Sequence, residues 1–243
     1  MTIVVPCYNE ERRLSVGTFS AFIAAHPEIT FLFVNDGSTD GTLRVLEGLR
    51  VSHPASVRVL TLPKNVGKAE GTRLGLLDAI QNGATCVGYW DADLATPLDA
   101  ILSFSEVLAQ KPAVTMVFGA RVQLLGRSIR RKKSRHYVGR AFATLVSMML
   151  RLGIYDTQCG AKLLRVNDAL RNALGEPFIT RWIFDVELII RLLKQVGGPQ
   201  VLARSIHEYP LQSWEDVGGS KVKGTDFLKA PVELLKIWWR YVV

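Results

Sequence analysis

Residues 87–93, VGYWDAD, join a short apolar run to two aspartates at alternate positions. The apolar part is typical of a buried strand that ends at Trp90. Residues two apart in extended backbone point to the same side, so Asp91 and Asp93 would present their carboxylates together. Repulsion between two such charges raises the pKa of one of them unless a cation lies nearby. Mg²⁺ or Mn²⁺ would suit the pair and would keep coordination positions open for a diphosphate.

On both sides of this motif, short apolar runs alternate with stretches in which apolar residues have helical spacing. This pattern predicts an α/β fold, with a doubly wound sheet and helices on both of its faces. The predicted strands are residues 3–6, 31–35, 57–62, 87–90 and 114–119. The predicted helices are residues 10–25, 42–49, 69–81 and 98–109. Such sheets bind ligands beyond the carboxyl ends of their strands, which is where the acidic pair lies.

Polar residues also follow the first two predicted strands. After the first strand, the ring of Tyr8 could stack on a base and Glu10 could accept hydrogen bonds from the base edge. After the second strand, Asp36 and Ser38 lie in a glycine-containing turn and suit a ribose or a uracil. Helix starts and turns often have the same composition, so each motif alone leaves both interpretations open.

The chain has a formal net charge of +8 and a pI near 9.6, which favours anionic partners such as nucleic acid, anionic lipid or phosphorylated substrates. Residues 126–140, GRSIRRKKSRHYVGR, hold seven Lys and Arg and no acid, and an apolar run follows at residues 141–150. Arg131 and Arg135 are four apart and would share one helix face. Basic residues beside an apolar segment suit an anionic head group on a hydrocarbon chain, although a solvated basic face is the common alternative.

Residues 226–243 are predicted to form an amphipathic C-terminal helix that follows a first domain of residues 1–225. Its polar residues form one stripe, at Lys229, Glu233, Lys236 and Arg240. The remaining surface is so apolar that it must be buried in the core, in a partner or at a membrane interface. The adjacent Trp238 and Trp239 favour the membrane interface, and burial in the core is the alternative.

The apolar run at residues 141–150 is too short to cross a bilayer, which needs about 20 residues, and no signal peptide is expected before the first strand. Three scattered cysteines argue against a disulfide framework or a zinc site and fit a reducing compartment. We therefore expect a cytoplasmic protein that is peripheral to the cytoplasmic face of a membrane.

Taken in order, four motifs resemble the inverting family 2 glycosyltransferases of GT-A fold. They are VPCYNEE at residues 5–11, VNDGSTD at 34–40, NVGK at 65–68 and DAD at 91–93. Three later motifs resemble the dolichyl-phosphate β-glucosyltransferases and their prokaryotic relatives, namely DTQCGAKL at residues 156–163, RWIFDVEL at 181–188 and GSK at 219–221. The resemblance covers nearly the whole chain. It implies a GT-A fold, which is a Rossmann-like, mostly parallel sheet flanked by helices.

The resemblance also implies a donor site and a metal site. The residues expected to bind the nucleotide-sugar are Pro6, Tyr8, Glu10, Asp36, Ser38, Lys68, Asp91, Asp156 and Gln158. Within this set, Lys68 would contact the diphosphate, whereas Asp156 and Gln158 would contact sugar hydroxyls. Asp91 and Asp93 would bind the divalent cation, Mg²⁺ or Mn²⁺, through the diphosphate.

On the acceptor side, Arg121 matches the arginine that binds the acceptor phosphate in the family. A guanidinium can engage two phosphate oxygens, and we expect Arg131 and Arg135 to join it there. Lys162 would balance charge. Asp185 stands where relatives with hydroxyl acceptors keep their catalytic base. We include it with the two metal-binding aspartates in the catalytic set, where it would orient acceptor or sugar; a helix N-terminal acid is the alternative.

The expected reaction is the inverting transfer of a hexose from a nucleotide-sugar, UDP-glucose, to a polyprenyl or dolichyl phosphate at a membrane surface, which gives a β-linked product. The acceptor phosphate is largely a dianion at neutral pH and would attack without a strong base. One alternative is a GDP-mannose-dependent polyprenyl-phosphate mannosyltransferase: Ala95 matches the glucosyl branch, but Leu94 replaces its common glycine. Another is a family 2 transferase with a hydroxyl (polysaccharide) acceptor, for which Asp185 would be indispensable.

Two other classes of protein are not expected. A nucleic-acid-binding protein would interleave aromatic residues with its basic ones, but the basic segment holds only Tyr137. The acidic pair and Lys68 argue against an inactive scaffold.

Overall fold

The computed structural model describes residues 1–130, 133–217 and 224–241 of the chain. Its strands are β1 (Thr2–Cys7), β2 (Thr30–Asp36), β3 (Val57–Leu62), β4 (Cys86–Trp90), β5 (Met116–Ala120), β6 (Ser128–Arg130), β7 (Ala161–Arg165), β8 (Ile206–Pro210) and β9 (Ser213–Glu215). Its helices are α1 (Val16–Ala25), α2 (Thr42–Ser52), α3 (Lys68–Gln81), α4 (Ala100–Gln110), α5 (Lys133–Leu150), α6 (Asp168–Leu174), α7 (Phe184–Val196), α8 (Pro199–Ser205) and α9 (Gly224–Tyr241).

One large sheet runs through the described part of the chain, with the strand order β3-β2-β1-β4-β7-β5-β8. β1 is parallel to β2 and β4, β2 is parallel to β3, and β5 is parallel to β8. β7 is antiparallel to both of its neighbours, β4 and β5. The prediction of a mostly parallel α/β sheet is confirmed. β6 and β9 form a separate parallel pair.

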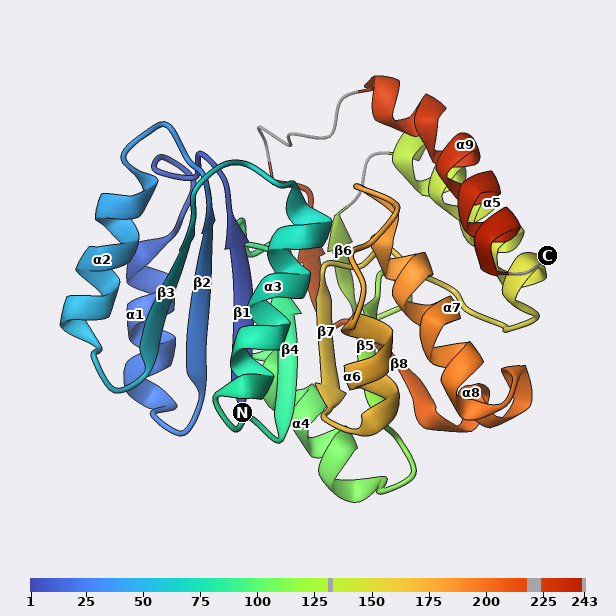
Figure 1. The fold of residues 1–243 in the computed structure, drawn as a ribbon, viewed down its shortest axis with the longest axis horizontal. Helices are drawn as coiled ribbons and strands as arrows, with labels where there is room; N and C mark the ends of the chain where they lie inside the picture. The colour runs from blue at the N-terminus through green and yellow to red at the C-terminus, as the bar shows by residue number, and fades with distance from the viewer. Residues whose placement is uncertain (131–132, 218–223, 242–243) are drawn as a thin grey trace.

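Alternate residues of the strands pack into two cores, because successive side chains point to opposite faces of a sheet. Ile3 and Val5 of β1 contribute to a core under α1, α2 and α4, whereas Val4 contributes to a core under α3, α6 and α7. In Figure 1, α3 and α6 cross in front of the sheet, and the N-terminus lies at its lower edge. The carboxyl ends of the parallel strands therefore meet at the upper edge.

The first helix begins later than predicted. We expected a helix over residues 10–25, but α1 begins at Val16. The amide of Leu14 donates a hydrogen bond to the carbonyl of Glu10 at 2.9 Å, and the amide of Glu10 donates to the hydroxyl of Thr42 at 2.7 Å. These bonds hold residues 10–14 as a turn against the start of α2, which closes the end of β1 instead of extending the helix.

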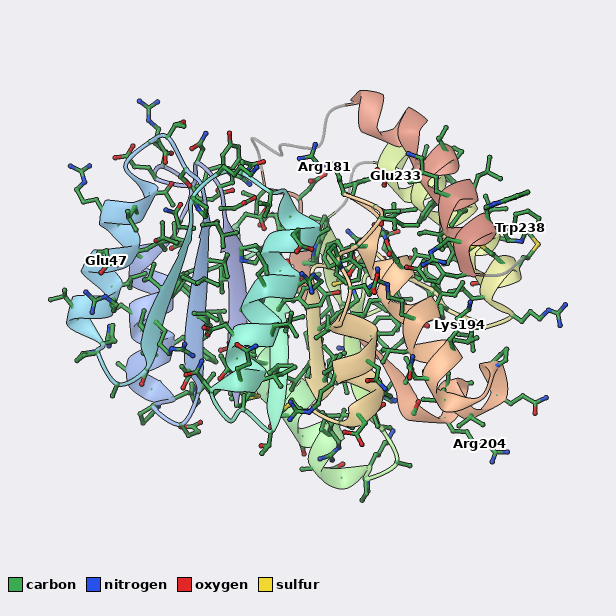
Figure 2. All side chains as sticks on the ribbon, viewed as in Figure 1. Glu47, Arg181, Lys194, Arg204, Glu233 and Trp238 are labelled. Carbon is green, nitrogen blue, oxygen red and sulfur yellow. The ribbon has the colours of Figure 1, made fainter. Side chains whose placement is uncertain are left out.

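The predicted C-terminal helix forms as part of α9, which packs on α7 and lies beside α5 at the upper right of Figure 1. Ala230, Leu234 and Ile237 are buried on its inner side. The outer side exposes Val232, Leu235, Trp238 and Trp239, and Trp238 points away from the domain in Figure 2. None of the helices in the described ranges has the length and hydropathy that a membrane crossing requires.

Candidate active site

A cavity of about 470 Å³ opens at the carboxyl ends of β4 and β5 and extends to α5 and α9. Its polar wall contains seven of the predicted site residues, namely Lys68, Asp91, Asp93, Arg121, Asp156, Gln158 and Asp185. Its apolar wall includes Phe142 and Leu145 of α5, Trp182, and Ala230 and Pro231 of α9. Residues that lie far apart in the sequence thus meet around one space, with charge on one side and apolar surface on the other.

Asp91 directly follows β4 and is supported by the loop before β7. Its amide donates to the carbonyl of Gly160 at 3.0 Å. Its carboxylate Oδ1 lies 2.5 Å from the Nζ of Lys68, the first residue of α3. Gly160 leaves room for this carboxylate, because a Cβ there would lie 2.7 Å from Oδ1 and closer still to Oδ2. Burial lowers the pKa of Lys68, but the carboxylates of Asp91, Asp185 and Asp93 together raise it above its usual value, so the ammonium stays charged.

Asp93 lies beside Asp91 and pairs with Arg13, whose Nη2 is 3.1 Å from Oδ2. Burial raises the pKa of Asp93, and the charge of Asp91 raises it further. Arg13 and Lys68 lower this pKa, yet it stays above the usual value. The pair of carboxylates therefore carries an electrostatic cost that a further cation would relieve.

The acidic pair fits a divalent cation. The two side chains are 32% and 26% exposed and offer carboxylate oxygens to the cavity, and the space beside Gly160 accommodates Asp91. Oxygen donors of this kind suit Mg²⁺ and Mn²⁺. Within residues 1–130, 133–217 and 224–241, no cluster of three or more His, Cys, Asp or Glu side chains could hold a metal alone. The remaining ligands would come from a substrate diphosphate or from water.

Asp36, at the end of β2, holds the loop that leads into α3. Its carboxylate accepts hydrogen bonds from the amides of Val66 and Gly67 at 2.7 and 2.9 Å, and from the side chain of Asn65 at 2.9 Å. Gly67 has a φ of +94°, which favours glycine. Lys68 follows directly, so Asp36 sets the position from which Lys68 reaches Asp91.

The other predicted nucleoside-binding residues lie at the ends of β1 and β2 and are not among the residues that line the cavity: Pro6, Tyr8, Glu10 and Ser38. Tyr8 is 36% exposed at this edge of the sheet. Glu10 is buried, and its carboxylate is 3.4 Å from Nη1 of Arg13. Because Arg13 also pairs with Asp93, it links this end of the sheet to the acidic pair.

Arg121 and Asp156, which we assigned to the acceptor and to the donor sugar, bind each other. Nε and Nη2 of Arg121 lie 2.6 and 2.7 Å from the two carboxylate oxygens. Burial lowers the pKa of Arg121, but Asp156, with smaller contributions from Cys159 and Asp91, raises it above its usual value overall. The guanidinium lies 5.1 Å from the ring centre of Trp214, and the amides of Tyr155 and Asp156 donate to Glu208 at 2.8 Å. Two residues that the sequence assigned to different substrates therefore meet at one point of the cavity wall.

Gln158 and Thr157 offer polar atoms that the protein does not use. The side-chain nitrogen of Gln158 and the hydroxyl of Thr157 are buried and have no hydrogen-bond partner among the described residues. Both residues line the cavity. An unpaired buried polar group is costly, and a hydroxyl-rich ligand would satisfy these two.

The predicted acceptor arginines are described only in part. Arg131 lies outside the described residues, and Arg135 falls in α5, where its side chain is not described. Arg140 of the same helix was not predicted, yet it lines the cavity. Its guanidinium is 3.7 Å from the ring centre of Tyr155, and it donates to the Tyr155 carbonyl at 2.9 Å. The dense run of arginines signalled a basic helix without showing which of them faces inward.

Arg181 is a second cationic residue whose position could not be predicted. It is exposed, and its Nε would lie 3.4 Å from a Cβ placed on Gly67, next to Lys68. Figure 2 shows it at the upper end of the molecule, close to the start of α3. Lys68 and Arg181 thus flank the loop before α3 from two sides.

Asp185 lies in the first turn of α7 and lines the cavity. It is buried, and its Oδ1 lies 2.5 Å from Nζ of Lys162. The same oxygen accepts a hydrogen bond from the hydroxyl of Tyr89. Burial raises the pKa of Tyr89 well above its usual value, and Asp185 raises it further.

Comparisons with known proteins identify the family and the fold of the chain. A model of the family described as "Glycosyl transferase family 2" matches residues 2–171. A dolichyl-phosphate β-glucosyltransferase of Drosophila melanogaster is 32% identical over 100% of this chain and 76% of its own length. One from Trichomonas vaginalis is 30% identical over 97% of this chain and 70% of its own. Among solved structures, glucosyl-3-phosphoglycerate synthase of Mycobacterium tuberculosis, with Mn²⁺, UDP and glucosyl-3-phosphoglycerate, has a TM-score of 0.69 and 18% identity, covering 100% of this chain and 80% of that one. This last likeness shows the fold.

Proposed function

The chain belongs to glycosyl transferase family 2, and on that premise we propose that it transfers glucose from UDP-glucose to a polyprenyl phosphate. Relatives that are about 30% identical over nearly the whole of this chain carry the name dolichyl-phosphate β-glucosyltransferase. The observation that carries the proposal is the cavity, in which an acidic pair and Lys68 face an apolar wall built by α5 and α9. A nucleotide-sugar diphosphate suits the first side, and a phosphate with a hydrocarbon tail suits the second.

A divalent cation, Mg²⁺ or Mn²⁺, is part of this proposal, and Asp91 and Asp93 would hold it. When bound, the cation would neutralise the charge of the departing nucleoside diphosphate. Lys68, whose ammonium stays charged, would add a second positive group there, and Asp36 would keep Lys68 in reach. The presence of Mn²⁺ with UDP in the solved structure that shares the fold supports this part of the proposal.

The donor would extend from the strand ends into the cavity. Pro6, Tyr8, Glu10, Asp36 and Ser38 would hold the nucleoside beside the cavity. The sugar would then lie near Gln158, whose buried amide nitrogen has no partner in the described part of the chain. Asp156 would approach the same sugar, with its carboxylate oriented by Arg121.

The acceptor phosphate would lie between Arg121 and Arg140, both of which line the cavity. Arg131 and Arg135 remain part of the proposed acceptor set on the strength of the sequence. The phosphate would attack the anomeric carbon opposite the diphosphate in one inverting displacement, which gives a β-linked product. Positioning and charge stabilisation would supply most of the catalysis, because a phosphate dianion is already a nucleophile.

The polyprenyl chain would leave the cavity along α5 and α9, whose outer residues form an exposed apolar surface. This outer surface comprises Leu145, Met148, Val232, Leu235, Trp238 and Trp239. Lys236 and Arg240 are exposed on the same helix, α9. Apolar and aromatic residues interleaved with basic ones suit an anionic membrane surface. We therefore propose that residues 1–225 form the transferase domain, that residues 226–243 face the cytoplasmic leaflet, and that the protein is peripheral to it.

A vesicle-binding assay tests the membrane proposal. Trp239→Ser removes a side chain that is 73% exposed on α9, and Val51→Ser removes one that is 71% exposed on α2, remote from the outer surface. With phosphatidylcholine–phosphatidylglycerol vesicles, we expect Trp239→Ser to weaken partitioning by about tenfold, or about 1.4 kcal/mol of lost apolar burial. Val51→Ser should partition like the wild type. Equal binding by both variants would contradict the proposed surface.

A donor panel tests the transfer itself. Purified protein is incubated with polyprenyl phosphate, Mn²⁺ and one of four donors: UDP-glucose, UDP-galactose, GDP-glucose or GDP-mannose. The lipid product is identified by mass spectrometry. Of the four donors, we expect UDP-glucose to give the most hexosyl phosphate lipid. Product from GDP-mannose alone would instead support the mannosyltransferase alternative, and sugar on a hydroxyl acceptor alone would support the polysaccharide alternative.

A further inference from the structure

Lys162 is a fully buried charge at the back of the cavity. It lies on β7, and its side chain has no exposed surface. Its Nζ donates to the carbonyl of Thr157 at 3.1 Å, to the carbonyl of Cys159 at 2.7 Å and to Oδ1 of Asp185 at 2.5 Å. These three bonds use all the protons of the ammonium. The only charge of opposite sign among these partners is that of Asp185.

Asp185 is held as tightly as the lysine. It is 5% exposed, and Oδ1 accepts from both Lys162 and the hydroxyl of Tyr89. The Nζ of Lys162 also lies 5.3 and 5.6 Å from the ring centres of Tyr89 and Phe118. Aromatic rings thus enclose the pair, so the carboxylate that faces the cavity is tied to an interior charge.

The loop held by Lys162 supports the acidic pair. Thr157 and Cys159, whose carbonyls bind the ammonium, lie in one loop with Gln158 and Gly160. Thr157, Gln158 and Gly160 of this loop line the cavity. The carbonyl of Gly160 accepts from the amide of Asp91 at 3.0 Å. A displacement of Lys162 would therefore shift both Asp185 and the loop that supports the acidic pair.

We propose that Lys162 is a positioning residue that keeps Asp185 as its counter-charge and prevents Asp185 from acting as a general base. This inference rests on the proposed function and deepens it, because it explains the class of acceptor. A phosphate dianion forms its bond to the anomeric carbon while the bond to the diphosphate breaks, and the electron pair leaves with the nucleoside diphosphate. No proton has to be removed. A hydroxyl acceptor must lose a proton, and Asp185 could take it only by leaving Lys162 as an unpaired buried charge.

A cycle of three variants tests the inference: Asp185→Asn, Lys162→Met and the two together. Each single variant leaves one buried charge without its partner, whereas the double variant removes both charges. With polyprenyl phosphate, we expect the double variant to have a kcat at least about tenfold above that of Asp185→Asn, and its KM for UDP-glucose to stay near the wild-type value. If Asp185 were a general base, its removal would instead lower kcat by about 10²- to 10⁴-fold, whichever residue is at position 162. A double variant no more active than Asp185→Asn would overturn the inference.

The wild-type protein gives a second test that does not depend on folding of the variants. Transfer from UDP-glucose to polyprenol, which has the same tail but a hydroxyl in place of the phosphate, should be slower than transfer to polyprenyl phosphate by about 10³-fold or more in kcat/KM. Comparable rates would overturn the inference while leaving glucose transfer to the phosphate intact. Absence of transfer to polyprenyl phosphate would mean that the proposed function itself fails.

Discussion

Replacing Gly160 with alanine would test how the acidic pair is supported. The added Cβ would lie 2.7 Å from Oδ1 of Asp91 and closer to Oδ2, whereas ordinary contacts begin at 3.4 Å, so the carboxylate must move by at least the difference of 0.7 Å. The carboxylate is the end of a flexible side chain and can rotate away. We therefore expect the free energy of unfolding to change by less than about 1 kcal/mol.

The same rotation would be costly for the reaction. It would break the 2.5 Å contact between Asp91 and Lys68 and would separate Asp91 from Asp93. A misplacement of about 1 Å near the reacting groups costs about 10²-fold in rate, or about 2.7 kcal/mol in the barrier. We expect Gly160→Ala to lower kcat for glucose transfer by about this factor and to raise the Mn²⁺ concentration needed for half-maximal activity.

Gly153→Ala is the matched control, because a Cβ at Gly153 would meet nothing within 4 Å. Both variants are assayed for transfer of labelled glucose from UDP-glucose to polyprenyl phosphate across a Mn²⁺ series, and their unfolding is followed by circular dichroism. Gly153→Ala should behave as the wild type. A kcat for Gly160→Ala within about threefold of the control would correspond to a barrier change below about 1 kcal/mol. That result would contradict the claim that the reaction depends on the position of Asp91.

Three further predictions concern single side chains. Asp91→Asn should lower metal-dependent transfer by about 100-fold or more with unfolding unchanged, since an amide is a poor ligand for Mg²⁺ or Mn²⁺; near-normal turnover would reject the metal role. Tyr241→Phe should lower the free energy of unfolding by about 1–2 kcal/mol in urea. The Tyr241 hydroxyl is hydrogen-bonded to both Glu187 and Arg191 at 3.0 Å and so attaches the end of α9 to α7. An unchanged urea midpoint would contradict this role. Burial raises the pKa of Cys86 to about 11. At pH 8, the rate of its alkylation by iodoacetamide should be about 100-fold lower than that of an ordinary cysteine. This rate should increase about tenfold per pH unit up to the pKa of Cys86. A rate that levels off near pH 9 would show an ordinary thiol.

Local patterns in the sequence predicted the frame of the fold well. The strands that lead to the site are short apolar runs that end in polar residues, and their direction follows from the intervening helices. β7 was not predicted, because its five residues directly follow a polar motif and its antiparallel place between β4 and β5 depends on pairing that no local period encodes. The late start of α1 has a similar cause, since it depends on a contact between Glu10 and Thr42 across 32 residues.

The site was predictable as a set of residues but not as a set of pairs. Motif spacing placed Asp91 and Asp93 together, and the cavity confirms that both face the same space. The pairing of Arg121 with Asp156, 35 residues away, joins two residues that the sequence assigned to different substrates. Pairing at that range depends on how β5 and the loop before β7 approach each other, which only the folded chain determines.

We propose above that glucose transfer to a lipid phosphate requires a divalent cation bound by the acidic pair, Asp91 and Asp93. The most direct measurement incubates the purified chain with labelled UDP-glucose and polyprenyl phosphate, with Mn²⁺ or with EDTA, and extracts the lipid. We expect labelled lipid to form with Mn²⁺, to be absent with EDTA, and to return when Mn²⁺ is added back. Label that enters the lipid equally well in EDTA, or that never enters it while UDP-glucose is consumed, would contradict it.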